Sequence, residues 1–166
     1  MKVRWIEFEN LKTNLRIERV NFNKDVTLLV GLSGAGKTQI LNAVEYSLNV
    51  AIDKAVILRP CRAEMGITIG KDEYEWFYEI DEVAQEDLII NAETKCEFVY
   101  EKLICNGKLI FERKGDKVNV IGYDKVPQPR KNESLILQYS EDKNFERLIA
   151  GIRKLYSVEL ELAGGG

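Results

Sequence analysis

The sequence predicts an α/β fold, in which a parallel core strand and a glycine-rich loop lead into a helix, followed by an antiparallel β-meander and a closing helix. Three observations predict this class. The segment 26–30 (VTLLV) is a short, almost continuous apolar run, as expected of a strand covered on both faces. A glycine-rich loop and an amphipathic helix follow it directly. From about Ala63 to Tyr123, apolar and polar residues alternate in several short runs, which is typical of antiparallel strands.

Residues 3–22 predict two paired strands that precede the core strand. Apolar and polar residues alternate in both strands, and each series changes phase once, as a β-bulge in each strand would produce. The apolar positions are Val3, Trp5, Ile6 and Phe8 in the first strand, and Leu15, Ile17, Val20 and Phe22 in the second.

A helix is predicted from about Lys37 to Val50, directly after the glycine-rich loop. Apolar residues recur at helical spacing on one side of it, whereas polar residues lie elsewhere. The predicted apolar stripe consists of Ile40, Leu41, Val44, Leu48 and Ala51.

The meander from about 63 to 123 is predicted from alternation and from turn residues. Asn106-Gly107 is a strong signal for a two-residue hairpin, and the sequence KGDK at 114–117 marks a second turn. Two runs define buried faces: Tyr74, Trp76, Tyr78 and Ile80 in the first, with Glu75 and Glu79 opposite, and Cys96, Phe98 and Tyr100 in the second.

The last part of the chain predicts a loop, a helix and a short strand. Prolines and charges mark 124–133 as a loop. Ser140 resembles an N-cap before a helix at about 141–156, and 157–162 (SVELEL) alternates as a strand does. We interpret 1–162 as one folded unit and 163–166 (AGGG) as an engineered linker or a scar of cloning. The first-turn acids are Glu141 and Asp142, and the apolar stripe is Phe145, Leu148, Ile149, Ile152, Leu155 and Tyr156.

Composition restricts the classes of function. The chain of 166 residues is 45% hydrophobic and 31% charged, as is usual for a globular protein. Its net charge of -3 argues against a globally basic coat for nucleic acid, and the lack of histidine removes the commonest general base. No apolar run reaches the length of a membrane span. Cys61, Cys96 and Cys105 lack metal-ligand spacing, so reduced thiols in a cytoplasmic protein are expected.

The glycine-rich loop fits the phosphate-binding pattern G-x-x-x-x-G-K-[ST] at Gly31–Thr38. Glycines let successive backbone N–H groups point at phosphate oxygens, and the following helix adds its unpaired amides and positive dipole end. Lys37 would contact the β- and γ-phosphates, and the Thr38 hydroxyl would bind Mg²⁺. The predicted nucleotide-binding residues of this loop are Gly31, Ser33, Gly34, Ala35, Gly36, Lys37, Thr38 and Gln39.

Hydrolysis also needs an acid that holds Mg²⁺ and orients the attacking water. Asp81-Glu82 is rejected as that acid, because the alternation before it indicates an antiparallel strand instead of a buried parallel one. The run 87–90 (DLII) ends in Asn91, which is not an acid. The sequence NKD at 23–25 precedes the phosphate loop and lacks the final aspartate of the guanine-reading pattern. The sequence therefore contains about half of a nucleotide site.

The order of these elements resembles the N-terminal lobe of ABC-type ATPases of the SMC, DNA-repair and RecF-like group. That group includes ATPases of bacterial anti-phage systems and of overcoming-lysogenisation nucleases. The resemblance lies in the first strand, the sequence FENLKTN at 8–14, the second strand, the segment 26–44 and the meander, and it extends to about Leu162. It implies a P-loop NTPase lobe that binds ATP and Mg²⁺.

The resemblance implies roles for two residues outside the phosphate loop. Lys12 stands where that group has an arginine that contacts nucleotide phosphate. Gln138 is the candidate for the glutamine that reaches Mg²⁺ and the attacking water, and Gln128, between prolines, is its poorer rival. Lys37 and Gln138 are therefore the candidate catalytic residues, with Thr38 and Gln138 as metal ligands. Without the resemblance, Lys12 could equally be a solvated lysine in a turn, and Gln138 could be an ordinary polar residue at the end of a strand.

The chain departs from the group's pattern in three elements. It has no loop resembling L-S-G-G-Q, no second acidic element and no switch histidine, all of which lie in a C-terminal lobe in that group. The resemblance therefore implies a partner lobe, from the same gene or a separate chain, and a homodimer or hetero-oligomer around ATP. Little or no hydrolysis is expected from this lobe alone. DNA repair or anti-phage defence is the implied process, with DNA or a nuclease as effector and no membrane.

Two alternatives remain at this stage. A small self-sufficient P-loop kinase would be wound as alternating strands and helices, which the long meander disfavours. A non-catalytic module, in which nucleotide gates a partner, could present Tyr74, Trp76 and Tyr78 as its partner face, although such a stripe is more often core.

Overall fold

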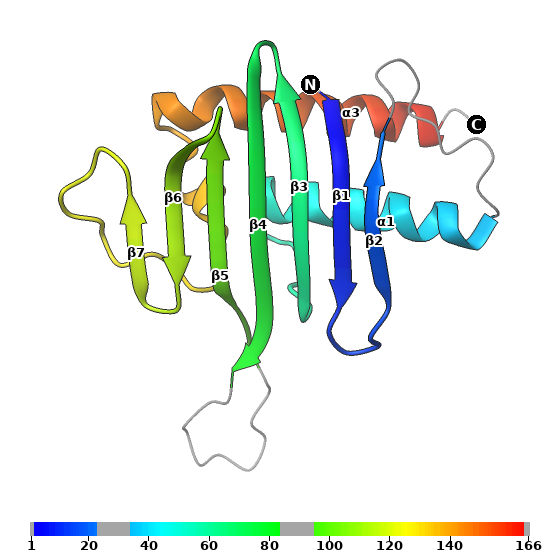
Figure 1. The fold of residues 1–166 in the computed structure, drawn as a ribbon, viewed down its shortest axis with the longest axis horizontal. Coiled ribbons are helices and arrows are strands. Elements are labelled where there is room, and N and C mark those ends of the chain that lie inside the picture. The colour runs from blue at the N-terminus through cyan, green and yellow to red at the C-terminus, as the bar shows by residue number, and fades with distance from the viewer. Residues whose placement is uncertain (1, 23–33, 84–94, 165–166) are drawn as a thin grey trace.

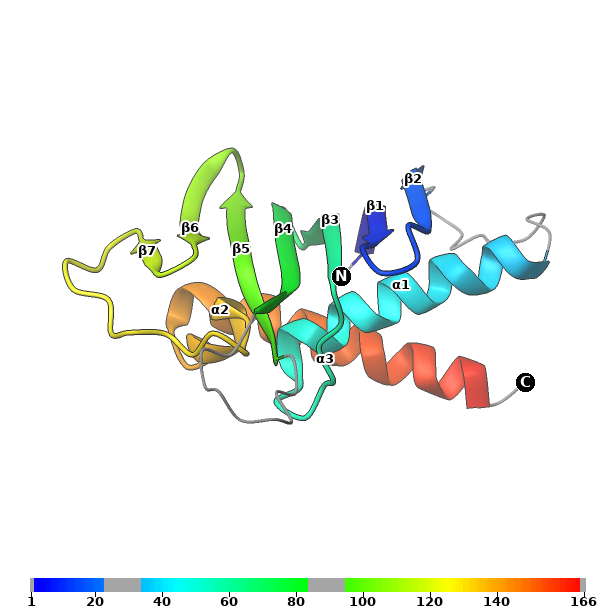
Figure 2. The ribbon, with the colours of Figure 1, turned by 90° about the horizontal axis from the view of Figure 1, so that it is seen from below.

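The computed structural model describes residues 2–22, 34–83 and 95–164, and in this part of the chain one antiparallel sheet of seven strands is covered on one face by helices (Figures 1 and 2). The strand order is β2-β1-β3-β4-β5-β6-β7. The elements are β1 (Lys2–Asn10), β2 (Arg16–Asn21), α1 (Gly34–Ile52), β3 (Cys61–Ile69), β4 (Asp72–Val83), β5 (Lys95–Cys105), β6 (Lys108–Lys114), β7 (Lys117–Val120), α2 (Leu135–Gln138) and α3 (Lys143–Gly164).

The predicted α/β class with a parallel core was wrong for the described part of the chain. All six strand pairings are antiparallel. Tight turns such as the one at Gly70 join most of the neighbouring strands, and a tight turn can only produce an antiparallel pair. The predicted core strand at 26–30 lies outside the described residues. The described fold is α+β, with a meander as the body of the sheet and helices on one side.

The strand pattern inside the sheet was predicted well. Pairing of β1 with β3 shifts between Val3 and Trp5, and pairing with β2 shifts between Ile6 and Phe8, so each of the first two strands carries the predicted irregularity. The β5–β6 hairpin turns through Asn106 and Gly107, which both have positive φ angles (49° and 78°), as a type I′ turn requires. The predicted buried face of β4 is confirmed at Tyr74, Trp76, Tyr78 and Ile80.

The core lies between the inner face of the sheet and the helices α1 and α3 (Figure 2). Helix α1 begins three residues earlier than predicted and buries Ile40, Val44, Leu48 and Ala51, but Leu41 is 42% exposed. Helix α3 begins at Lys143 and not at 141, with Asp142 accepting the backbone N–H of Phe145. The residues that α3 buries are Phe145, Leu148, Ile149 and Ile152.

Two predictions for the last third of the chain were wrong. The segment 157–162 continues α3 and does not form a strand, because a helix already nucleated extends more easily than a six-residue strand without a partner forms. Ser140 is not the N-cap of the last helix, because α3 begins only at Lys143. The serine that caps a helix in this region is Ser134, which accepts the N–H of Ile136 at the start of α2. The loop predicted at 124–133 is confirmed, because no helix or strand is present there.

The helix-free face of the sheet is covered by charged side chains and one aromatic ring. Arg62 forms ion pairs with Glu9 and Glu79 across β1, β3 and β4. Trp5 lies over Gly66 on the same face, and the guanidinium carbon of Arg19 is 3.8 Å from the centroid of its ring. This face is therefore solvated, except where Trp5 is covered. No helix in the described segments has the length and hydropathy needed to cross a membrane.

Candidate functional site

The described part of the phosphate loop forms the first turn of α1. Gly31 and Ser33 lie outside the described residues, whereas the backbone from Gly34 to Thr38 is helical. A Cβ added at Gly36 would meet no heavy atom of the described residues within 4 Å, so the backbone there is open to a close approach. Thr38 and Gln39 are exposed, and the first turn contains no acidic residue. The N-terminal end of this 19-residue helix is therefore the positive end of its dipole, and no carboxylate in the first turn offsets that charge.

Lys12 lies in the turn between β1 and β2, where a local hydrogen-bond pattern explains the sequence ENLKTN. The Asn10 side chain accepts the backbone N–H groups of Lys12 (3.0 Å) and Thr13 (3.1 Å), which is an Asx-turn. The Lys12 ammonium lies 2.7 Å from Glu82 Oε1, and this hydrogen bond and charge raise the pKa of Lys12. The partner that the structure gives Lys12 is therefore a carboxylate at the end of β4.

Asp81 and Glu82 occupy the end of β4, which pairs antiparallel with β3 and β5. Both residues are exposed. The pair was rejected as the water-activating acid because an antiparallel strand was predicted before it. That prediction is confirmed, since β4 is antiparallel to both of its neighbours.

Gln138 is the last residue of α2, a helix that lies near the C-terminal end of α1 (Figure 2). It lines a cleft of about 700 Å³ together with Lys54, which follows α1 directly. A helix of 19 residues is about 28 Å long. The structure therefore does not bring Gln138 together with Thr38, its predicted partner in Mg²⁺ binding.

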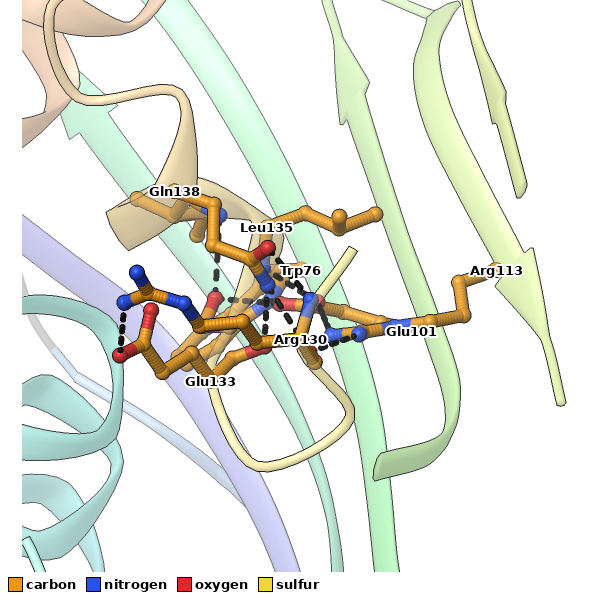
Figure 3. A network of polar contacts seen from close by, with 9 residues as sticks. Trp76, Glu101, Arg113, Arg130, Glu133, Leu135 and Gln138 are labelled. Atoms are coloured by element: carbon orange, nitrogen blue, oxygen red, sulfur yellow. Dashed lines mark hydrogen bonds and ion pairs between the residues drawn. The ribbon is translucent and has the colours of Figure 1, made fainter. Parts of the chain in front are cut away.

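All polar groups of the Gln138 side chain bind the loop that precedes α2. Its Oε1 accepts the backbone N–H of Arg130 at 2.8 Å, and its Nε2 donates to the carbonyl oxygens of Arg130 and Glu133 at 3.0 and 2.9 Å (Figure 3). In this structure Gln138 fixes the conformation of the loop.

A network of polar contacts around the buried Glu101 carboxylate was not predicted (Figure 3). Glu101 Oε2 accepts the indole N–H of Trp76 (3.0 Å) and the hydroxyl of Ser134 (2.5 Å). Its Oε1 accepts Arg113 Nη2 and the backbone N–H of Leu135, both at 2.8 Å. Four donors from β4, β6 and the start of α2 therefore converge on one carboxylate.

Arg113 extends the network from Glu101 to the loop before α2. Its side chain is fully buried, and it donates to the carbonyls of Arg130 (3.0 Å) and Glu133 (2.8 Å). These are the same two carbonyls that Gln138 binds from the other side. The loop is thus held between Arg113 and Gln138, and the network anchors α2 to the sheet.

A β-bulge explains why sequence reasoning missed Glu101. Register between β4 and β5 shifts at Ile80, which leaves Val99 as an extra residue of β5. The prediction that Tyr100 shares the buried face of Phe98 was therefore wrong, and Tyr100 instead donates to Glu112 on the helix-free face. The shift turns Glu101 into the core. The only signal for this network in the sequence was that Glu101 and Arg113, which carry opposite charges, face each other on neighbouring strands.

Replacing Gln138 with alanine is expected to lower the free energy of unfolding by about 1–2 kcal/mol, because three hydrogen bonds to the loop are lost. Urea denaturation would measure this change. The exposed Gln128 in the same loop provides the matched control, and Gln128→Ala should change stability by no more than about 0.5 kcal/mol. A Gln138→Ala protein of unchanged stability that loses Mg-ATP affinity would contradict the structural role.

The Cys61 thiol is buried, and burial raises its pKa to about 12, so it remains protonated. Within 2–22, 34–83 and 95–164 there is no group of three or more acidic or cysteine side chains that could hold a metal ion.

No family model, curated protein or solved structure matches this chain. The features of this chain that point to a function are the phosphate-loop sequence and the helix that follows it.

Proposed function

We propose that this chain binds Mg-ATP at the N-terminal end of α1, as one lobe of an ABC-type ATPase that needs a second lobe or subunit for hydrolysis. The observation that carries the proposal is the sequence Gly31–Thr38, whose final residues form the first turn of a 19-residue helix. The mechanism of such a loop requires this junction of glycines and helix N-terminus. The proposal concerns the loop and α1, and it does not depend on a parallel sheet within this chain.

Each residue type at this junction has a defined role in holding a triphosphate. The backbone amides of the loop and of the first turn would donate to phosphate oxygens, where the open space at Gly36 permits close approach. Lys37 would place its ammonium between the β- and γ-phosphates, and Thr38 would bind Mg²⁺ through its hydroxyl. The lack of an acid in the first turn keeps this end attractive to an anion.

Two carboxylates of the described chain support the need for a second surface. Glu101 is enclosed by four donors, and Glu82 is paired with Lys12 at the end of an antiparallel strand. Both carboxylates are therefore already engaged by groups of this chain. A partner lobe or subunit would supply the missing acid, and DNA or a nuclease would then be the effector in repair or anti-phage defence, as the sequence resemblance implies. The antiparallel sheet disfavours the alternative of a self-sufficient kinase.

Lys37→Ala is expected to weaken Mg-ATP binding at least tenfold, or by about 1.4 kcal/mol, because the only lysine of the loop is lost. Isothermal titration with ATP in the presence of Mg²⁺ would measure the affinity. Lys71→Ala, in the exposed turn between β3 and β4, is the matched control and should bind ATP as the unaltered chain does. Equal affinity in the Lys37 variant, or no binding by the unaltered chain, would overturn the proposal.

A phosphate-release assay distinguishes a split site, which needs a partner for hydrolysis, from a complete enzyme. The chain alone should release phosphate from ATP at the background rate. Turnover that Lys37→Ala abolishes would show that this chain hydrolyses ATP without a partner, and ATP loss that depends on an added acceptor would favour a kinase. If a second lobe restores no turnover although ATP binds, the nucleotide would serve to gate a partner.

A further inference from the structure

A second cleft, distinct from the phosphate loop, lies at the opposite end of α1. It has a volume of about 570 Å³ and lies between the connection from α1 to β3, the start of β5 and the loop before α2. The side chains that line it and matter here are Lys54, Lys95, Lys131, Glu97, Val56 and Leu58.

The charge of this cleft is opposite to that of the whole chain. Three lysines and one glutamate line it, whereas the net charge of the chain is -3. Lys131 already forms an ion pair with Asp116, at 2.9 Å. Lys54 and Lys95 are both exposed, and no ion pair within the described residues joins either of them. Opposite charge attracts and orients an incoming partner, most strongly at low salt.

The connection beside this cleft is apolar at three consecutive positions. Ile57 is 77% exposed, the most exposed of the large hydrophobic residues in the described chain, and it stands between the half-buried Val56 and Leu58. An isoleucine in water with apolar neighbours offers area that a partner could bury.

The backbone of this connection also has unused hydrogen-bonding groups. Val56 N–H donates to Asp53 at 3.4 Å, and the Ile57 carbonyl accepts the Tyr46 hydroxyl at 3.4 Å. Within the described residues, no hydrogen bond uses the N–H groups of Ile57 and Leu58. An extended peptide could accept one of these N–H groups with a carbonyl of its own backbone.

We propose that this cleft binds an acidic, extended peptide segment of a partner protein. The carboxylates of the peptide bind Lys54 and Lys95, its apolar residues pack against Val56 and Leu58 in the cleft and cover Ile57 beside them, and a carbonyl of its backbone accepts one of the unused N–H groups of the connection. Nucleic acid would satisfy the lysines but would use neither the apolar surface nor the unused backbone N–H groups. This proposal is independent of ATP binding, because Lys37 lies at the other end of α1.

A fluorescein-labelled peptide of alternating glutamate and valine is the probe, with binding measured by fluorescence anisotropy at low salt and at physiological salt. Lys54→Glu and Lys95→Glu should each weaken binding about tenfold, and Ile57→Ser severalfold, whereas Lys71→Glu should have less than a twofold effect. The thermal unfolding midpoint of each variant checks that the fold is retained. Lys37→Ala should bind the probe as the unaltered chain does, which separates this proposal from that of ATP binding.

Two altered probes test the remaining parts of the proposal without changing the protein. A peptide of alternating lysine and valine should not bind, and a glutamate–valine peptide with N-methylated amides should bind at least tenfold more weakly, because it cannot pair through its backbone. Equal binding by either peptide, no binding by the original probe, or tighter binding by a polythymidine oligonucleotide at the same two lysines would overturn the proposal.

Discussion

Glu101→Ala should lower the free energy of unfolding by about 3–5 kcal/mol, the largest effect of any single substitution considered for this protein. Arg113 would remain in the core without its carboxylate, and the indole N–H of Trp76 would lose its acceptor. An uncompensated charge in a low-dielectric interior costs far more than the intact pair contributes. Urea denaturation followed by circular dichroism would measure the change.

A double substitution provides the control for this interpretation. Replacing Glu101 with leucine and Arg113 with methionine removes both charges and keeps the volume approximately constant. Buried pairs replaced in this way are often as stable as the original, so the double variant should be more stable than Glu101→Ala by about 1 kcal/mol or more. A loss of less than about 1 kcal/mol in the single variant would show that the network contributes little to stability.

Gly66→Ala should lower the free energy of unfolding by about 2–3 kcal/mol, at the upper end of the usual cost of overpacking. A Cβ at this position would lie only 2.7 Å from Cδ1 and Cε2 of Trp5, so the indole would have to leave its place on the sheet. Its contact with Arg19 would be lost as well. Thermal unfolding measures the stability, and a red shift in tryptophan emission would report the exposure of Trp5.

The two positions should be strongly coupled. In a Trp5→Ala background there is no ring for the new methyl group to meet, so Gly66→Ala should then cost at most about 0.5 kcal/mol. A double-mutant cycle measures this coupling. If Gly66→Ala cost the same in both backgrounds, the effect would come from the backbone of β3 and not from the ring above it.

Local patterns of sequence were sufficient to predict most of the sheet. Alternation placed the buried face of β4, and Asn106-Gly107 placed the β5–β6 hairpin, because both signals depend only on neighbouring residues. The overall class was not predictable in this way. Segment 26–30 was interpreted as a core strand from its apolar run, but a parallel pair depends on a second strand elsewhere in the chain, which no local pattern identifies.

The polar network shows what local patterns cannot reveal about a site. The burial of Glu101 depends on a register shift at Val99, and its partners Ser134 and Leu135 are more than thirty residues away in sequence. Gln138 was identified as a residue with a specific task, but its contacts are with the loop before α2 and not with Thr38. The phosphate loop could be identified from sequence because its donors are consecutive in the chain.

The two outermost strands of the sheet have a consequence for self-association. Edge strand β2 carries a bulge and presents Arg16, Glu18 and Arg19, whereas edge strand β7 has only four residues and begins with a lysine. Short, irregular or charged edge strands are poor templates for pairing with further strands. Within the residues that the structure describes, the sheet therefore has no long, flat edge on which copies of the chain could stack, which protects this part of the chain against fibre growth.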